Sequence, residues 1–191
     1  MRKDKRPVVG DGPLSGSTIL SVTMESSGTR FVRDNLALNG ASVRHRHVVV
    51  GSSVGEVGSV RDPFASILSW WFRDPFASIL SWWFRMRANV NRVEICVDHV
   101  RRWDWWLDHR PDRVVRVDLC GREDLWELGC DRFVDERWST GEYPQKALYE
   151  QGRFDCLEMD LGEKVWQAWT DCRGRIQAHM VELGYDLPWF K

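Results

Sequence analysis

Three arginines, Arg33, Arg44 and Arg46, are the side chains in this sequence best placed to bind an anion together. They flank Asn39-Gly40, which lies between two short apolar runs and is the signature of a two-residue type I′ hairpin turn. With the register counted outward from that turn, the arginines share one face of a hairpin spanning residues 29–50. Arg33 and Arg46 then oppose each other directly, which is unfavourable unless an anion lies between them. We expect this face to bind RNA or another phosphoanion.

Other patterns that could support catalysis or metal binding are incomplete. His45 and His47 share one strand face and could hold an ion, but no second cluster with metal-ligand spacing accompanies them. Cys120 before Gly121 is an isolated candidate nucleophile, and the sequence contains no Gly-x-Ser-x-Gly elbow. The glycine-rich residues 51–58 lack the Gly-Lys-Ser/Thr ending of a phosphate loop. These observations favour a protein that is not an enzyme and that uses no metal or cofactor.

The sequence also contains a tandem duplication. The twelve residues RDPFASILSWWF occur twice without a difference, at residues 61–72 and again at 73–84. The unit is too short for a solenoid repeat, so we interpret it as a recent in-frame duplication. In each copy Asp-Pro predicts a helix start, with Asp62 or Asp74 as the N-cap residue. Because Pro75 would break a continuous helix, we expect two short helices separated near residues 73–74.

The two predicted helices are apolar over most of their circumference, so they need a partner. That partner is the rest of the fold or another protein; a membrane surface is the alternative, since Trp and Phe suit the interface. An aromatic surface on this helical pair predicts binding to a protein partner or self-association. Its residues are Phe64, Trp71, Phe72, Phe76, Trp83 and Phe84.

Length and composition are those of a folded chain. The 191 residues are 43% hydrophobic and 29% charged, with a net charge of −1 and 12 Trp, and 22 of the 27 Lys and Arg residues are Arg. Arg and Trp together suit RNA, nucleotide or protein interfaces, although a GC-rich genome would enrich Arg as well. Five scattered cysteines without a Cys-x-x-Cys pair, and no secretory signal, predict an intracellular protein. No apolar run is long enough for a membrane-spanning helix.

The remaining pattern places the predicted elements. Residues 1–17 are charged and then rich in Gly, Pro and Ser, which predicts disorder. Alternation predicts strands at residues 19–24, 93–98, 113–119 and 154–161. Helical spacing predicts helices at 99–109 and 163–183, weaker ones at 123–128, 132–138 and 144–150, and an aromatic tail at 185–191 that docks on the fold.

We therefore expect one α+β domain over residues 18–191. In it an antiparallel, hairpin-containing sheet packs against several short helices and one long C-terminal amphipathic helix. The function we expect is that of a non-enzymatic accessory or interaction protein of viral or mobile-element type, acting through the aromatic helical surface. The alternative is the RNA- or phosphoanion-binding module described above.

Overall fold

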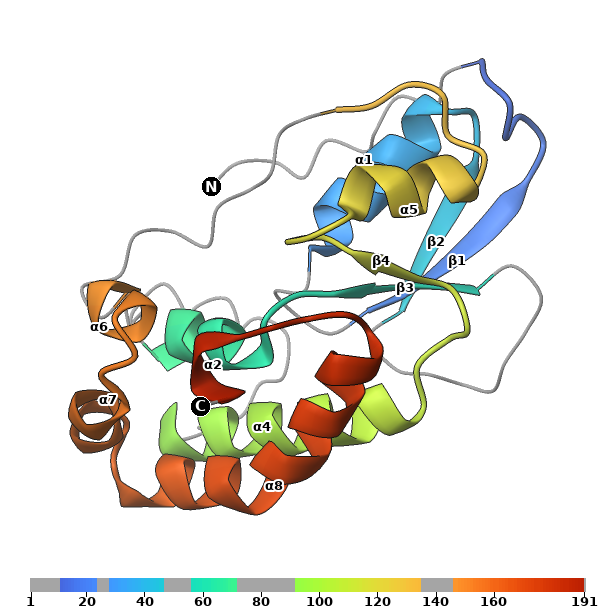
Figure 1. Ribbon diagram of the computed structural model, residues 1–191. Helices are drawn as coiled ribbons and strands as arrows, with labels where there is room; N and C mark the ends of the chain where they lie inside the picture. Colours follow the sequence, from blue (N-terminus) through green and yellow to red (C-terminus); the bar gives the residue numbers. More distant parts are fainter. Residues whose placement is uncertain (1–10, 24–27, 47–55, 72–91, 135–145, 191) are drawn as a thin grey trace, which may run out of the picture. The chain divides into compact units, whose positions relative to one another are not determined.

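The computed structural model describes residues 11–23, 28–46, 56–71, 92–134 and 146–190 (Figure 1). The chain divides into two compact units. The first comprises residues 1–61 and 109–138, and the second comprises residues 62–108 and 139–191. Along the sequence, part of the second unit is therefore inserted into the first.

The first unit is built on a parallel sheet. Its strands are β1 (Thr18–Thr23), β2 (Ser42–Arg46), β3 (Glu56–Val60) and β4 (Val114–Arg116). They lie in the order β2-β1-β3-β4, and each of the three pairings is parallel. The chain is thus of the α/β class, and the predicted α+β fold with an antiparallel, hairpin-containing sheet is wrong.

The predicted hairpin is replaced by a helix and a strand. Helix α1 (Thr29–Leu38) connects β1 to β2, and Asn39-Gly40 ends the helix. Gly40 has φ +93°, its N–H donates to the Ala37 carbonyl, and the next N–H along the chain donates to the Leu36 carbonyl. This is a Schellman motif, and Asn-Gly suits it as well as it suits a type I′ turn. A dipeptide that fits both structures misled the sequence interpretation.

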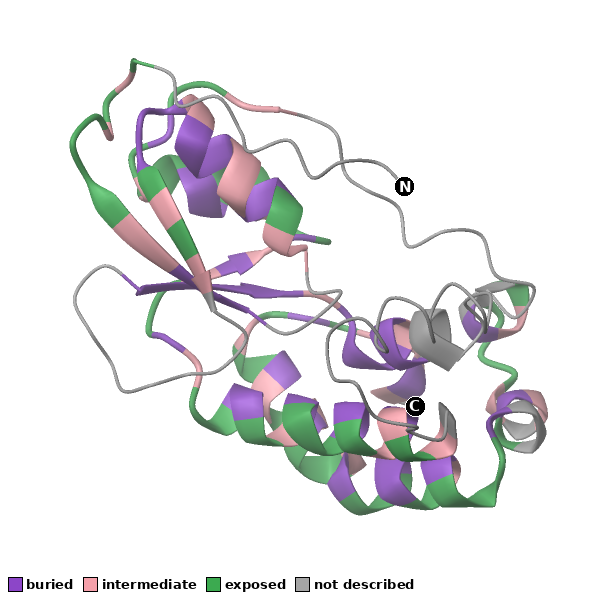
Figure 2. Ribbon diagram, turned by 180° about the vertical axis from the view of Figure 1, so that it is seen from behind, coloured by how far each residue is buried: buried purple, intermediate pink, exposed green. Residues whose placement is uncertain are grey.

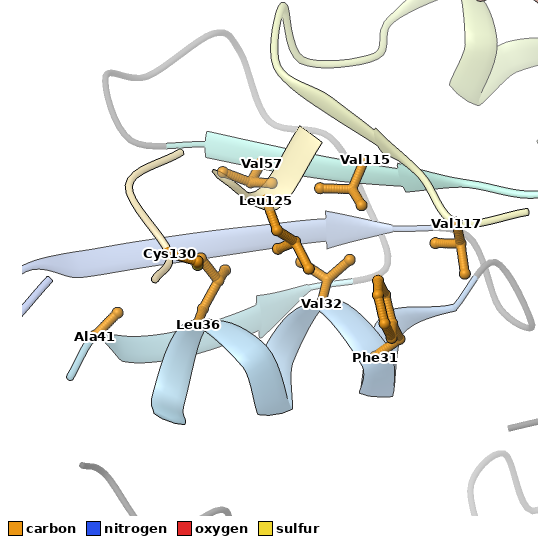
Figure 3. Packing of buried hydrophobic residues seen from close by; sticks show 9 residues of the cluster. All are labelled: Phe31, Val32, Leu36, Ala41, Val57, Val115, Val117, Leu125 and Cys130. Atoms are coloured by element: carbon orange, nitrogen blue, oxygen red, sulfur yellow. The ribbon is translucent and has the colours of Figure 1, made fainter. Parts of the chain in front are cut away.

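Helices α1 and α5 (Gly121–Glu127) lie next to each other on one face of the sheet (Figure 1). Their apolar side chains and those of the strands form the core of this unit (Figure 3). The core consists of Phe31, Val32, Leu36, Ala41, Val57, Val115, Val117, Leu125 and Cys130. Strand β3 is buried along its whole length (Figure 2), as is usual for a central strand of a parallel sheet.

The described part of the second unit is helical. It contains α2 (Pro63–Trp71), α4 (Arg92–Asp108), α6 (Lys146–Glu150), α7 (Phe154–Leu161), α8 (Glu163–Glu182) and the 3₁₀ turn η1 (Pro188–Phe190). Helices α4 and α8 run in the same direction. Asp104 on α4 pairs with Arg175 on α8, and four residues further along both helices Asp108 pairs with His179. Fully buried aromatic side chains fill the interior. They are Phe64, Trp103, Trp106, Trp169 and Trp189.

Several of the other predicted elements are confirmed, and two more are wrong. The strands near residues 19 and 115 are β1 and β4, and the long C-terminal helix is α8, which ends at Glu182 and is followed by the cap Leu183 and by Gly184 with φ +80°. The aromatic tail docks on the fold, since Tyr185 and Trp189 are buried. The segments 93–98 and 154–161, however, belong to helices α4 and α7 rather than to strands.

Helix α2 coincides with the first copy of the duplication, and its predicted start is confirmed. The Asp62 carboxylate accepts hydrogen bonds from the backbone N–H groups of Phe64 (3.0 Å) and Ala65 (3.3 Å).

Residues 72–91, which include the second copy, lie outside the described residues, as do residues 1–10. Residues 11–17 form a turn held by the Leu14 N–H on the Asn39 carbonyl at 2.9 Å. Among the helices in the described ranges, none is both long and apolar enough to cross a membrane.

Candidate functional site

The strand order creates a switch point at the carboxyl edge of the sheet. From β1 the chain crosses through α1 to β2 on one side, and from β3 it continues to β4 on the other side (Figure 1). The connections that leave β1 and β3 therefore diverge. In open α/β sheets, ligands bind outside the carboxyl ends of the strands where such a divergence occurs. This edge of the first unit is the candidate site.

Buried hydroxyl groups gather on the two central strands near that edge. Ser21 and Thr23 on β1 and Ser59 on β3 are fully buried, and Thr23 and Ser59 are register partners. The Thr23 Oγ1 atom lies 2.5 Å from the Thr29 Oγ1 atom, so a hydrogen bond joins the end of β1 to the first residue of α1. Central strands of parallel sheets are usually apolar, so hydroxyl groups here are unusual.

Gly28 makes the entry into α1 possible. It has φ +91°, and a Cβ atom built on it would lie 2.6 Å from Val117 Cγ2. Both observations require glycine at this position. The first turn of α1 carries no acidic residue, and no side chain in the described part of the chain caps the helix. Within the described residues, no acidic side chain of the first turn and no cap offsets its partial positive charge, and a helix start of this kind attracts anions.

Arg61 adds a cation directly after β3. Its Nε donates to Asp118 Oδ1 at 2.9 Å, and this ion pair joins the chain just after β3 to the chain just after β4. The side chains of Arg61 and Asp118 are 20% and 33% exposed, so the pair is partly open to solvent. In the described part of the chain only the Nε atom of Arg61 is engaged. Within those residues its two Nη groups make no hydrogen bond, while Asp118 orients the guanidinium.

The structure does not group the three arginines predicted from the sequence. Arg33 lies on α1, where its Nε is 3.0 Å from Asp34 Oδ1. Arg44 is an exposed residue of β2, and the side chain of Arg46, the last residue of that strand, lies outside the described residues. Without a hairpin, Arg33 has no strand position opposite Arg46. Anion binding by these residues stays a prediction.

The predicted aromatic surface is only partly described. Phe64 is fully buried and packs against aromatic side chains of the second unit, with its ring centroid 4.7 Å from that of Trp169 and 5.7 Å from that of Tyr149. Phe64 is therefore a core residue of this unit. Trp71 ends α2 with a side chain outside the described part, and Phe72, Phe76, Trp83 and Phe84 lie outside it entirely. An interaction surface on those residues stays a prediction.

Sequence reasoning missed Gly28, Thr29 and Arg61. The available signal was Gly28, four residues after the end of the predicted strand at residues 19–24 and before an apolar helical spacing of Phe31, Val32 and Leu36. The assignment of residues 29–50 to a hairpin concealed it. Arg61 was considered only as the first residue of the repeat.

The cysteines and possible metal ligands do not add a second site. All five cysteines are free. Burial, assisted by the nearby Asp131 carboxylate, raises the pKa of the Cys130 thiol to about 11, so this group stays protonated and unreactive near neutral pH. Within the described ranges, no three His, Cys, Asp or Glu side chains are grouped so that they could hold a metal ion.

Comparison of the chain with protein-family models, with curated proteins and with solved structures finds no match.

Proposed function

We propose that the first unit binds a phosphorylated small molecule at the carboxyl edge of its sheet, between the ends of β1 and β3. The observation that carries this proposal is the all-parallel order β2-β1-β3-β4, which sets a switch point next to Gly28 and Arg61. A phosphate group is the ligand chemistry that suits a helix start and an arginine together.

Each residue has a defined role in this proposal. Gly28 lets a phosphate approach the backbone at the start of α1, because it has no side chain and adopts positive φ. The two Nη groups of Arg61 donate to phosphate oxygens in the bidentate manner that guanidinium favours. With the Thr23 hydroxyl donating to it, the Thr29 hydroxyl keeps its own proton and is a further donor at the first position of the helix.

This proposal keeps the phosphoanion-binding alternative from the sequence but moves it to other residues. The cation is Arg61 at the sheet edge, whereas Arg33 and Arg44 lie on a helix and on another strand. The two versions are distinguishable, because Arg44 is exposed on the same sheet and its replacement removes the same charge.

Binding should be measured by isothermal titration calorimetry with pyrophosphate and with a nucleoside triphosphate, on wild type, Arg61→Gln and Arg44→Gln. We expect Arg61→Gln to weaken binding by about 10-fold or more, because a hydrogen bond between charged groups contributes about 1.5–3 kcal/mol. Arg44→Gln should change the dissociation constant by less than about 3-fold, through a screened, long-range effect.

The two ligands separate two sources of affinity. Equal affinity for both indicates that the phosphates alone are recognised, and tighter binding of the nucleotide adds a base or sugar pocket. Melting temperatures control for stability, because the partly exposed Arg61–Asp118 pair contributes at most about 1 kcal/mol. The proposal is wrong if neither ligand binds at low salt, or if Arg44→Gln weakens binding more than Arg61→Gln.

A further inference from the structure

Helix α2 contacts the rest of the second unit through four side chains of the first repeat copy, Asp62, Phe64, Ser66 and Ile67. The Asp62 carboxylate caps α2 and also accepts hydrogen bonds from Trp189 Nε1 at 3.0 Å and from the Tyr149 hydroxyl. Asp62 is only 8% exposed, and its acceptor capacity is used by groups from distant parts of the chain. This carboxylate is thus a specific fixing point for the docked helix.

The apolar contacts that α2 makes in the second unit are equally specific. The Phe64 ring lies among four aromatic rings, with the Trp169 and Tyr149 centroids at 4.7 and 5.7 Å and those of Phe154 and Trp166 at 5.8 and 6.3 Å. Ile67 is fully buried beside it along the helix.

A third contact completes the set. The Ser66 Oγ atom lies 3.1 Å from the His99 Nε2 atom of α4, and both residues are buried. The docked helix is therefore recognised by a carboxylate, an aromatic ring, a hydroxyl and a branched aliphatic side chain at fixed spacing.

Every one of these four residues recurs twelve positions later. Asp74, Phe76, Ser78 and Ile79 stand in the second copy at the same spacing and in the same surrounding sequence. The described groups that receive α2 come from α4, α6, α7, α8 and η1, which lie outside both copies. These described contacts do not distinguish one copy from the other.

We infer that the second copy, residues 73–84 of the same chain, can replace the first at this place, so that the folded protein exists in two registers. In the alternative register Asp74 accepts the hydrogen bonds of Tyr149 and Trp189, Phe76 enters the aromatic cluster and Ser78 meets His99. The twelve residues of the undocked copy then move from the connection that follows the docked helix to the connection that precedes it. The connection before the docked helix then grows from Arg61 alone to residues 61–73, so the logarithmic dependence of loop-closure free energy on length favours the first register by about 10-fold in population.

Aspartate substitutions in the full chain test the inference. The variants are Asp62→Ala, Asp74→Ala and the double variant, and the measurement is the unfolding equilibrium constant from chemical denaturation. Asp62→Ala disables the more populated register and should change the constant by about 10-fold, whereas Asp74→Ala disables the less populated one and should change it by less than about 2-fold. The double variant leaves the Tyr149 and Trp189 donors without an acceptor in both registers, and it should change the constant by at least about 10-fold more than the product of the singles.

Other patterns overturn the inference. If Asp62→Ala is as destabilised as the double variant while Asp74→Ala equals wild type, only the first copy docks; the reverse pattern means that only the second does. A double variant as stable as wild type also overturns it, because neither aspartate would then support a docked helix. Should the double variant fail to fold, both single variants folding supports exchange, and the failure of one single variant excludes it.

A parallel cycle and a control make the result independent of the aspartate. Phe64→Ala, Phe76→Ala and their combination should repeat the non-additive pattern, because the same register change restores the ring. In a chain lacking residues 73–84 there is no second copy, so Asp62→Ala should there cost as much as the double variant does in the full chain. An equal effect of Asp62→Ala in both backgrounds overturns the inference. So does an unfolding midpoint of Asp62→Ala that rises with protein concentration, because the replacing copy would then come from another molecule.

Discussion

Asp62 is the residue on which most of the specificity of the second unit converges. Its carboxylate accepts hydrogen bonds from two backbone N–H groups, from Trp189 and from Tyr149 while remaining buried. A buried carboxylate with several donors is stabilising, whereas the same group without them would be costly. The Asp-Pro dipeptide predicts the helix cap, because capping is local. It cannot predict Tyr149 and Trp189, which are 87 and 127 residues away.

Trp169 gives a residue-scale prediction. It is 1% exposed, and its ring centroid lies 4.9 Å from that of Trp189 and 4.7 Å from that of Phe64. Trp169→Ala should therefore lower the free energy of unfolding by about 3–5 kcal/mol, as expected when a buried aromatic side chain is truncated. Trp126→Ala is the matched control, because Trp126 is 72% exposed and its loss should change stability by less than about 0.5 kcal/mol. Chemical denaturation measures both, and equal effects would contradict the assignment of Trp169 to the core.

Among the elements, a long periodic pattern identified a helix, whereas short alternating patterns did not separate helices from strands. Helix α8 repeats its apolar positions over 20 residues, and β1 is a compact β-branched run. In contrast, alternation over only six residues, 93–98, predicted a strand. The buried residues Cys96, Val100, Trp103 and Leu107 reveal the helical period only when the window extends past residue 98. The same ambiguity affected residues 154–161, where the buried Leu157 and Leu161 are four apart.

The sheet topology and the candidate site could not be predicted from local sequence patterns, because both depend on contacts between distant parts of the chain. Strand order depends on which strands pair across the chain, and β3 pairs with β4 through residues more than 50 positions apart. The Asn39 side chain also joins α1 to a distant segment, since its Oδ1 accepts from the Asp131 and Arg132 N–H groups at 2.9 and 3.1 Å. Once α1 was interpreted as part of a hairpin, the strand-glycine-helix connection at Gly28 could not be recognised.

Replacing Gly28 and Gly174 by alanine should change the stability of the protein in opposite directions. Gly28→Ala should destabilise the first unit by about 1–3 kcal/mol or more, because alanine is strained at φ +91° and its Cβ would meet Val117. Gly174 lies inside α8 with nothing within 4 Å of a built Cβ, so Gly174→Ala should stabilise the protein by about 0.5–1 kcal/mol. Thermal or chemical denaturation measures both. A neutral Gly28→Ala would contradict the close approach of α1 and Val117.

On the scale of the whole molecule, the two units differ in how they are built. The first is an α/β layer with an apolar core between one face of its sheet and two helices, while the described part of the second is helical and rich in aromatic rings. The chain leaves the first unit after Arg61 and returns at His109. The duplication begins at this junction, with Arg61 in the first unit and Asp62 in the second. An insertion of twelve residues there lengthens a connection without interrupting a described strand.

The last prediction is that the chain still folds after removal of residues 73–84. The deletion creates no new junction, because Phe72 then precedes Arg85 as Phe84 does in the full chain. One copy supplies the described contacts of α2, so we expect the far-UV circular dichroism signals of the sheet and of α8 to persist, with cooperative unfolding. The removed copy carries a Phe-Ile-Leu-Trp-Trp-Phe set, and burial of each such side chain contributes about 1.5–3 kcal/mol, which is too much apolar surface to leave in water. Light scattering of both chains shows where it is buried: a larger assembly for the full chain alone indicates self-association, and equal monomers indicate burial within the fold. If the shortened chain does not fold, one copy is not sufficient and both are needed for the second unit.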